Sequence, residues 1–290
     1  MNNKFLMMTH RLTTFLLAAG ITLLLTGTAA AQSDCLLFDL QGREPVFQAG
    51  ERVTYTLSYT WGVWINVGEV EFLTSLVKAP PKPFYHVEVN GKTYSFFDNF
   101  FKVRDYFSTK IDAQTLQPFY MQRTIDEGGY RRNSMGYYNR QSEVIYSSTQ
   151  RLDKPQPAKR DTLPLTPCTF DVVSIFYYYR CCDFSQMKTN TTYTVQLAMD
   201  NEVHNIRYKL YGAEVINVRG VGKFRTLKFS ASLIAGTVFT GEEQVFFWVT
   251  DDANRVPVYI EAPVVVGSIR ARIKTWKNLK HQLLMENSKI

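Results

Sequence analysis

The chain has 290 residues, a formal net charge of +7 at pH 7 and four cysteines, and 14% of it is aromatic. The positive excess is modest and no Lys/Arg block or nucleic-acid-binding module is present, so the sequence argues against a nucleic-acid partner. The histidines are scattered and no phosphate-binding glycine loop occurs, so we expect neither a metal nor another cofactor.

The N-terminus has the pattern of a secretory signal peptide. Lys4 and Arg11 precede an apolar run, and small residues at 29–31 offer a cleavage site. An uncleaved membrane anchor is the alternative, but the apolar run is short for a membrane span. We therefore expect residues 1–31 to be removed on export and residues 32–290 to form a single β-rich domain. No later stretch is long and apolar enough to cross a bilayer.

Most of the remaining chain alternates apolar and polar residues, which predicts strands with one buried face. The predicted strands are 52–61, 70–74, 85–89, 104–111, 118–124, 130–139, 143–148, 192–199, 203–211, 214–218, 222–233, 244–250, 256–260 and 264–273. Asn90-Gly91 and residues 126–129 have the composition of tight turns. Residues 151–167 are polar and contain prolines, which predicts a linker.

Helical spacing appears at three places. Four phenylalanines between 96 and 101 predict a short helix, and residues 276–290 fit a short amphipathic helix or a frayed tail. The longest helix is predicted over 170–180, with Thr169 or Asp171 as the residue that caps its first turn. Apolar residues recur there at spacings of four and three, namely Val172, Phe176 and Tyr179. A buried strand is the alternative, because Val, Ile and Tyr are mediocre helix formers.

Two segments resemble each other, residues 111–118 and 250–257. Each joins two predicted strands through an Asp and a later Pro. We interpret them as similar tight turns in which the Asp accepts backbone hydrogen bonds and the Pro begins the next strand.

Four cysteines in an exported chain permit disulfides in three pairings. Adjacent cysteines rarely bond each other, which disfavours a Cys181–Cys182 bridge. We favour a disulfide between Cys35 and Cys168, which would pin the mature N-terminus to the start of the predicted helix. Cys181 and Cys182 would then be thiols or bonded elsewhere. The chain contains no Cys-x-x-Cys motif, so the sequence gives little support to a redox role.

The sequence has no recognisable catalytic motif, so we do not expect an enzyme. Carboxylate pairs occur at Asp251-Asp252 and Glu242-Glu243, and a glycan hydrolase that uses two carboxylates remains an alternative, since such residues need no local motif.

Aromatic residues on a curved sheet either pack a core or line an apolar pocket. Those near predicted turns and helices are our candidates for a pocket: Trp61, Trp64, Tyr94, Phe97, Phe100, Phe101, Tyr177 and Tyr178.

Several motifs together resemble one exported bacterial family. They are Phe47-Gln48-Ala49-Gly50-Glu51, Asp112-x-x-x-Leu116-x-Pro118, Phe170-Asp171-Val172-Val173-Ser174, Asp183-Phe184-Ser185 and Trp248-Val249-Thr250-Asp251-Asp252-x-x-Arg255-x-Pro257. The family is domain of unknown function 3108, and the chain is most similar to members from the Bacteroides group, over residues 45–275. The resemblance implies that the protein is exported to the periplasm of a Gram-negative bacterium. It gives no catalytic residues, because the family has no established activity.

The hairpins are also similar to those of LolA/LolB-type periplasmic lipoprotein carriers, which have a curved sheet around short helices and an apolar cavity. We therefore expect a mainly β fold, a curved antiparallel sheet or incomplete β-barrel with one or two short helices on its concave side. The favoured function is a non-enzymatic carrier or binding protein for an apolar envelope ligand, a lipid or acyl chain. The alternative is an envelope protein-interaction or structural module.

Overall fold

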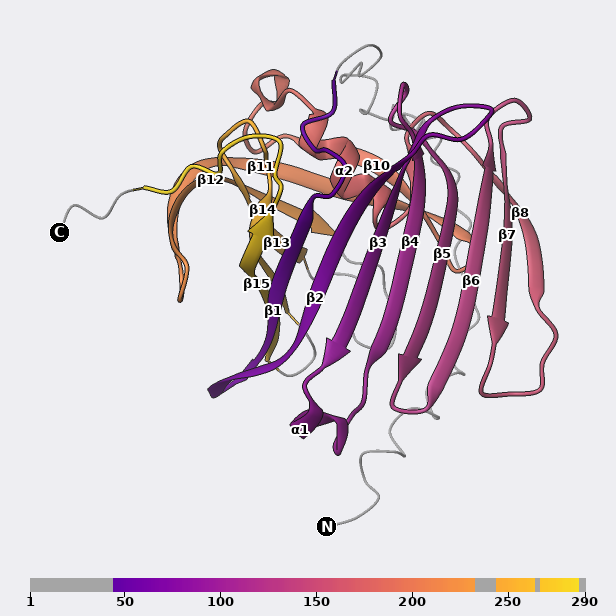
Figure 1. The fold of residues 1–290 in the computed structure, drawn as a ribbon, viewed down its shortest axis with the longest axis horizontal. Coiled ribbons are helices and arrows are strands. Elements are labelled where there is room, and N and C mark those ends of the chain that lie inside the picture. The colour runs from indigo at the N-terminus through magenta and orange to yellow at the C-terminus, as the bar shows by residue number, and fades with distance from the viewer. Residues whose placement is uncertain (1–43, 233–243, 264–266, 287–290) are drawn as a thin grey trace, which may run out of the picture. The chain divides into compact units, whose positions relative to one another are not determined.

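The computed structural model describes residues 44–232, 244–263 and 267–286. Their fifteen strands form one sheet with the order β8-β7-β6-β5-β4-β3-β2-β1-β15-β14-β13-β12-β11-β10-β9 (Figure 1). All neighbours are antiparallel except the short pair β9 and β10. The strands are β1 (Arg52–Trp61), β2 (Val63–Val77), β3 (Phe84–Thr93), β4 (Arg104–Asp112), β5 (Pro118–Glu127), β6 (Tyr130–Asn139), β7 (Val144–Arg151), β8 (Lys159–Pro164), β9 (Thr169–Phe170), β10 (Thr192–Met199), β11 (Glu202–Val218), β12 (Gly222–Ser232), β13 (Gln244–Thr250), β14 (Pro257–Pro263) and β15 (Ser268–Lys277).

The two ends of the sheet approach each other through side chains. Asp200 and Asn201 in the β10–β11 turn have φ angles of 58° and 64°, the left-handed conformations that a type I′ turn requires. The Asp200 carboxylate lies 2.9 Å from Arg123 Nη1 and 3.1 Å from Arg132 Nη1. Asn201 Nδ2 donates to the Lys159 carbonyl at 3.2 Å. The sheet is curved but open, because the edge strands β8 and β9 are not paired with each other.

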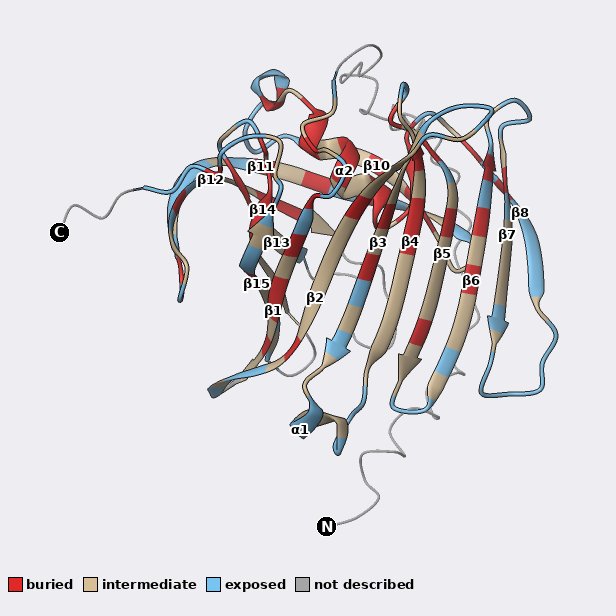
Figure 2. Ribbon diagram, in the orientation of Figure 1, coloured by how far each residue is buried: buried red, intermediate tan, exposed pale blue. Residues whose placement is uncertain are grey.

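The main helix, α2 (Ser174–Cys181), packs on the concave side of this sheet (Figures 1 and 2). The Asp171 carboxylate accepts hydrogen bonds from the backbone N–H groups of Val173 and Ser174, at 2.9 and 3.0 Å. It also accepts the Thr109 hydroxyl of β4 at 2.8 Å, which ties the helix start to the sheet. Asp171 therefore caps the first turn, as predicted. The segment forms a helix, and the alternative of a buried strand is wrong. The helix begins four residues later than predicted, because Phe170 still pairs with β10.

Helix α2 fills the main hydrophobic core together with residues from strands in both halves of the sheet. Val87 and Val89 of β3 belong to this core, as do Val195 of β10 and Phe229 of β12. The curved mainly β architecture with a helix on the concave side is thus confirmed. The second helix, α1 (Ser95–Asp98), contains no buried residue. In the described part of the chain, no helix has the length and apolar character needed to cross a bilayer.

Four local predictions were wrong. The two strands predicted at 203–211 and 214–218 are one continuous strand, β11. Residues 151–167 contain the edge strand β8, which alternation does not reveal because five of its six residues are exposed. Asn90-Gly91 is not a turn, since β3 continues through it and remains paired with both β2 and β4. Residues 278–286 form neither the amphipathic helix nor the frayed tail that were predicted: Leu283 is buried in a second core, and Glu286 bridges to Lys223. Residues 287–290 lie outside the described residues.

Candidate ligand cavity

An apolar cavity of about 370 Å³ lies between α2 and strands β10–β14. Its volume is within the range of small-molecule sites in proteins. Most of its lining side chains carry no polar atom. The lining residues are Val172, Ile175, Phe176, Tyr179, Arg180, Phe184, Val195, Leu197, Met199, Ile206, Tyr208, Phe229, Ala231, Ser232, Val245, Phe247, Val249, Arg255, Pro257 and Ile260.

The residues that line this cavity follow two sequence periodicities, one helical and one of alternating strand residues. The helical segment contributes positions 172, 175, 176, 179 and 180, which lie on one face of a helix. The strands contribute mainly every second residue, for example 195, 197 and 199 of β10 and 245, 247 and 249 of β13, because alternate residues of a strand point to one face of the sheet. The wall is therefore the concave face of β10–β13 and the opposing face of the helix.

A smaller cavity of about 180 Å³ lies beside the first, toward β1 and β2. Phe176, Arg180, Pro257 and Ile260 line both cavities. The side chains of Phe176 and Ile260 are incompletely buried, and they stand between the two spaces.

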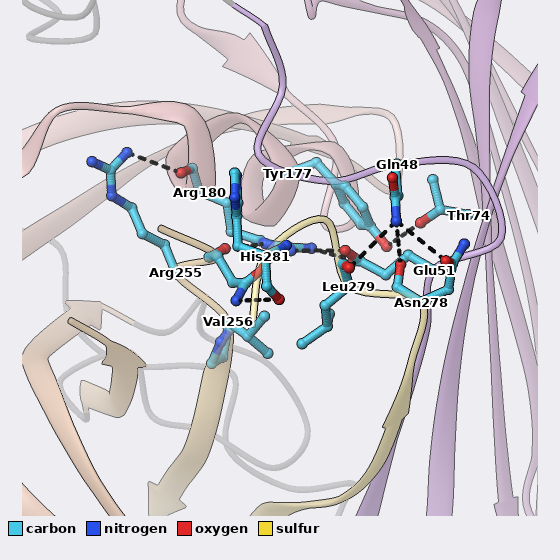
Figure 3. A network of polar contacts seen from close by, with 12 residues as sticks. Gln48, Glu51, Thr74, Tyr177, Arg180, Arg255, Val256, Asn278, Leu279 and His281 are labelled. Atoms are coloured by element: carbon cyan, nitrogen blue, oxygen red, sulfur yellow. Dashed lines mark hydrogen bonds and ion pairs between the residues drawn. The ribbon is translucent and has the colours of Figure 1, made fainter. Parts of the chain in front are cut away.

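Arg180 fixes the helix between the cavities through a buried ion pair (Figure 3). Its Nη1 lies 2.5 Å from Glu51 Oε1 and its Nη2 lies 3.0 Å from Glu51 Oε2, a bidentate arrangement. Its Nε donates to the Asn254 carbonyl at 3.0 Å. Burial opposes the guanidinium charge, but the Glu51 carboxylate outweighs it, so the pKa of Arg180 is held above its ordinary value.

Two tyrosine hydroxyls add further polar contacts near the smaller cavity. The Tyr177 hydroxyl lies 2.9 Å from Thr74 Oγ1 of β2 (Figure 3), and the Tyr55 hydroxyl donates to the Pro257 carbonyl at 2.9 Å. Burial raises the pKa of both tyrosines. These hydroxyls therefore remain neutral at physiological pH. Their hydrogen bonds hold α2 against β2 and Tyr55 against the start of β14.

The eight aromatic residues proposed from sequence fall into two separate groups. Tyr177 and Tyr178 are buried on α2. Tyr177 lines the smaller cavity and packs edge-on against Phe47 at 4.8 Å, while the ring of Tyr178 lies 4.4 Å from that of Phe170. Their neighbours Phe176 and Tyr179 line the larger cavity, although the sequence singled them out only as evidence for a helix.

The second group lies around α1 and the β1–β2 hairpin. Phe100 and Phe101 are 75% and 55% exposed, and Tyr94 and Phe97 are half-buried. Trp64 is also half-buried. The guanidiniums of Arg270 and Arg272 lie 4.7 and 5.8 Å from its ring centre. The side chain of Trp61 lies outside the described residues. None of the described members of this group lines either cavity.

Cys181 and Cys182 are buried thiols at the end of α2. Burial raises the pKa of Cys181 despite the nearby cations Arg180, Arg255 and Lys280. A buried thiol of raised pKa is a weak nucleophile. Cys168 is completely buried, whereas Cys35 lies outside the described residues, so the Cys35–Cys168 disulfide stays a prediction.

Among the described residues, Glu51 is the one carboxylate that lines either cavity. Asp251 pairs with Arg225 at 2.8 Å on the surface, and Asp252 accepts backbone hydrogen bonds in its turn. Glu242-Glu243 lie outside the described residues. Asp105 and Glu127 interact with each other, but neither lines a cavity described above. Across the described ranges, no group of three or more His, Cys, Asp or Glu side chains is arranged to hold a metal ion.

An open, curved antiparallel sheet with an apolar cavity beside an inner helix is a β-barrel-like architecture. The chain is similar in fold to the crystal structure of a β-barrel-like protein of domain of unknown function DUF1849 from Brucella abortus. The likeness covers 80% of this chain and 99% of that chain, with a TM-score of 0.53 and 12% sequence identity, and it shows the fold alone.

Residues 54–274 match the family described as protein of unknown function DUF3108, and the chain belongs to this family. The resemblance seen in the sequence motifs is thereby confirmed. Comparison with curated proteins gives no match.

Proposed function

We propose that this protein is an exported, periplasmic, non-enzymatic binding or carrier protein for an apolar envelope ligand such as a lipid acyl chain. The observation that carries the proposal is the apolar cavity between α2 and β10–β14. A preformed cavity bounded by side chains such as Ile206, Phe229 and Phe247 favours the transfer of an acyl chain out of water, by about 0.8 kcal/mol for each buried methylene. The N-terminal signal-peptide pattern supports an envelope location.

Filling the cavity tests the proposal directly. Ala231 of β12 lines the cavity, so Ala231→Phe places a ring in the space that a ligand needs. The matched control is Ala213→Phe, at an exposed position of the neighbouring strand β11. The readout is binding of Nile red, a neutral apolar dye, followed by its fluorescence and by displacement with dodecanol.

The expected result is at least tenfold weaker dye binding in Ala231→Phe and unchanged binding in Ala213→Phe. Both variants must retain the far-ultraviolet circular dichroism of the parent protein. Equal dye affinity in the parent and both variants, or no saturable dye binding in the parent, would contradict the proposed function.

A further inference from the structure

Two charged residues, Arg180 and Arg255, interrupt the apolar lining of the larger cavity. The charge of Arg180 is compensated by the bidentate contact with Glu51. The charge of Arg255 is not compensated in this way: among the described residues, no carboxylate lies within ion-pair distance of its guanidinium. Arg255 therefore contributes one uncompensated positive charge beside the larger cavity.

The conformation of the β13–β14 turn places Arg255 beside the larger cavity. Arg255 has a φ of 49°, a left-handed conformation that is uncommon for residues other than glycine. The Asp252 carboxylate stabilises it by accepting the backbone N–H of Arg255 at 3.2 Å and that of Asn254 at 2.9 Å. The equivalent turn between β4 and β5 has Leu116 at the left-handed position, with a φ of 56°, so the turn geometry itself does not demand an arginine.

The guanidinium of Arg255 lies across the end of α2, as Figure 3 shows. Its Nη1 donates to the Arg180 carbonyl at 3.2 Å, and its centre lies 5.5 Å from the ring of Phe184. A guanidinium has five N–H donors in a fixed fork that matches a carboxylate or a phosphate. The contact with Arg180 engages one of its nitrogens, which leaves donors available to a ligand.

A guanidinium without a carboxylate partner beside an apolar cavity favours a ligand that joins an anionic head to an apolar tail, because the anion can pair with the guanidinium. We propose that the cavity binds an amphiphile with an anionic head, a carboxylate or a phosphate, which pairs with Arg255 while its aliphatic tail packs against β10–β13 and α2. This inference rests on the proposed function and specifies the chemistry of its ligand.

The test compares three ligands of equal chain length at pH 8: dodecanoate, dodecyl phosphate and dodecanol, each below its micelle concentration. Their dissociation constants are measured by displacement of Nile red from the purified protein. We expect both anions to bind at least tenfold more tightly than the alcohol. Arg255→Gln should abolish this preference, and Arg255→Lys should retain part of it.

The control variant is Arg225→Gln, since Arg225 is an exposed arginine paired with Asp251 outside the cavity. It should keep the parent preference for anions. The readout is the ratio of anion to alcohol affinity within one variant, so a lower folded fraction in Arg255→Gln changes both affinities alike and leaves the ratio intact.

Two results would overturn the inference while the proposed function stands: dodecanol binding the parent as tightly as the anions, or Arg255→Gln keeping the preference. A preference for only one of the two anions would identify the head group. If none of the three ligands displaces the dye, the proposed function itself fails.

Discussion

Loss of the Glu51 carboxylate should destabilise the protein more than loss of an exposed carboxylate. Glu51 is 1% exposed and the Arg180 side chain 6% exposed, so Glu51→Gln leaves a buried guanidinium without its counter-ion. Breaking such a pair from one side costs about 3–5 kcal/mol. The Gln oxygen can still accept one hydrogen bond, so we expect the lower end of that range, about 3 kcal/mol.

The assay is urea denaturation followed by tryptophan fluorescence, with the midpoint converted to a free energy of unfolding at constant m-value. A loss of this size also lowers the melting temperature by roughly 10 °C in a domain of this length. The control is Glu71→Gln, because Glu71 pairs with Arg52 at 3.4 Å on the surface, where an ion pair contributes about 0–1 kcal/mol.

The double variant Glu51→Gln/Arg180→Met provides the second half of the test. Arg180→Met alone leaves Glu51 unpaired, so both single variants should be strongly destabilised. Because neither buried charge remains in the double variant, its loss should be smaller than the sum of the single losses by at least about 2 kcal/mol. A loss below about 1 kcal/mol for Glu51→Gln, or strict additivity of the two substitutions, would show that the buried Glu51–Arg180 pair does not hold the helix in place.

Three further predictions concern residues outside the cavity. Burial raises the pKa of Asp105 to about 7 from 3.8, so the folded state retains a proton that the unfolded state has lost, and the free energy of unfolding should fall as the pH rises from about 4 to 7. Because Asp105 is partly exposed, we expect the free energy of unfolding to fall by about 1–2 kcal/mol over this range. Asp105→Asn should remove this pH dependence, as measured by melting curves between pH 4 and 8. Phe100→Ser should change the free energy of unfolding by less than about 0.5 kcal/mol, because Phe100 is 75% exposed, as measured by urea denaturation. Peptide mapping of the exported protein without reduction should recover a Cys35–Cys168 peptide, and loss of that bridge should cost about 4 kcal/mol on the chain-entropy estimate.

Each of these predictions has an outcome that contradicts it. A melting temperature of Asp105→Asn that follows the parent at every pH would exclude Asp105 as the source of the pH dependence. Destabilisation of Phe100→Ser by more than 1 kcal/mol would show that Phe100 is covered in solution. Recovery of Cys168 as an alkylated thiol from the unreduced protein would exclude the predicted disulfide.

The sequence predicted the repeated local features of the fold well. Alternation located most strands, since each has one face toward the core. The resemblance of the two turns is confirmed in part. Asp112 accepts backbone hydrogen bonds as predicted, whereas in the second turn the acceptor is Asp252, one residue after the Asp251 that aligns with Asp112. Pro118 and Pro257 begin the next strands.

The cavity could not be predicted in the same way, because it depends on contacts between distant segments. Arg180 pairs with Glu51 across 129 positions, and no local pattern connects the two residues. Strand residues such as Ile206 and Phe247 belong to visible alternating patterns, but alternation does not say that their faces meet α2 across a space.

The aromatic candidates show the same difference between local structure, which the sequence predicts, and long-range packing, which it does not. Local spacing correctly predicted a helical turn near Phe97, but it also drew attention to Phe100 and Phe101, which are exposed. Phe176 and Tyr179 line the larger cavity and were noticed only as evidence for a helix. The faces of α2 are set by its packing against β3 and β10–β13, which depends on the curvature of the whole sheet.

The most direct test of a carrier function is mass spectrometry of an organic extract from residues 32–290, exported by a bacterial host and purified without detergent. We expect an anionic amphiphile at close to one molecule per protein, with much less in Ala231→Phe, whose cavity is filled. The same lipid at the same level in the parent and in Ala231→Phe would rule out binding in this cavity, because the ligand would then lie outside the space between α2 and β10–β14.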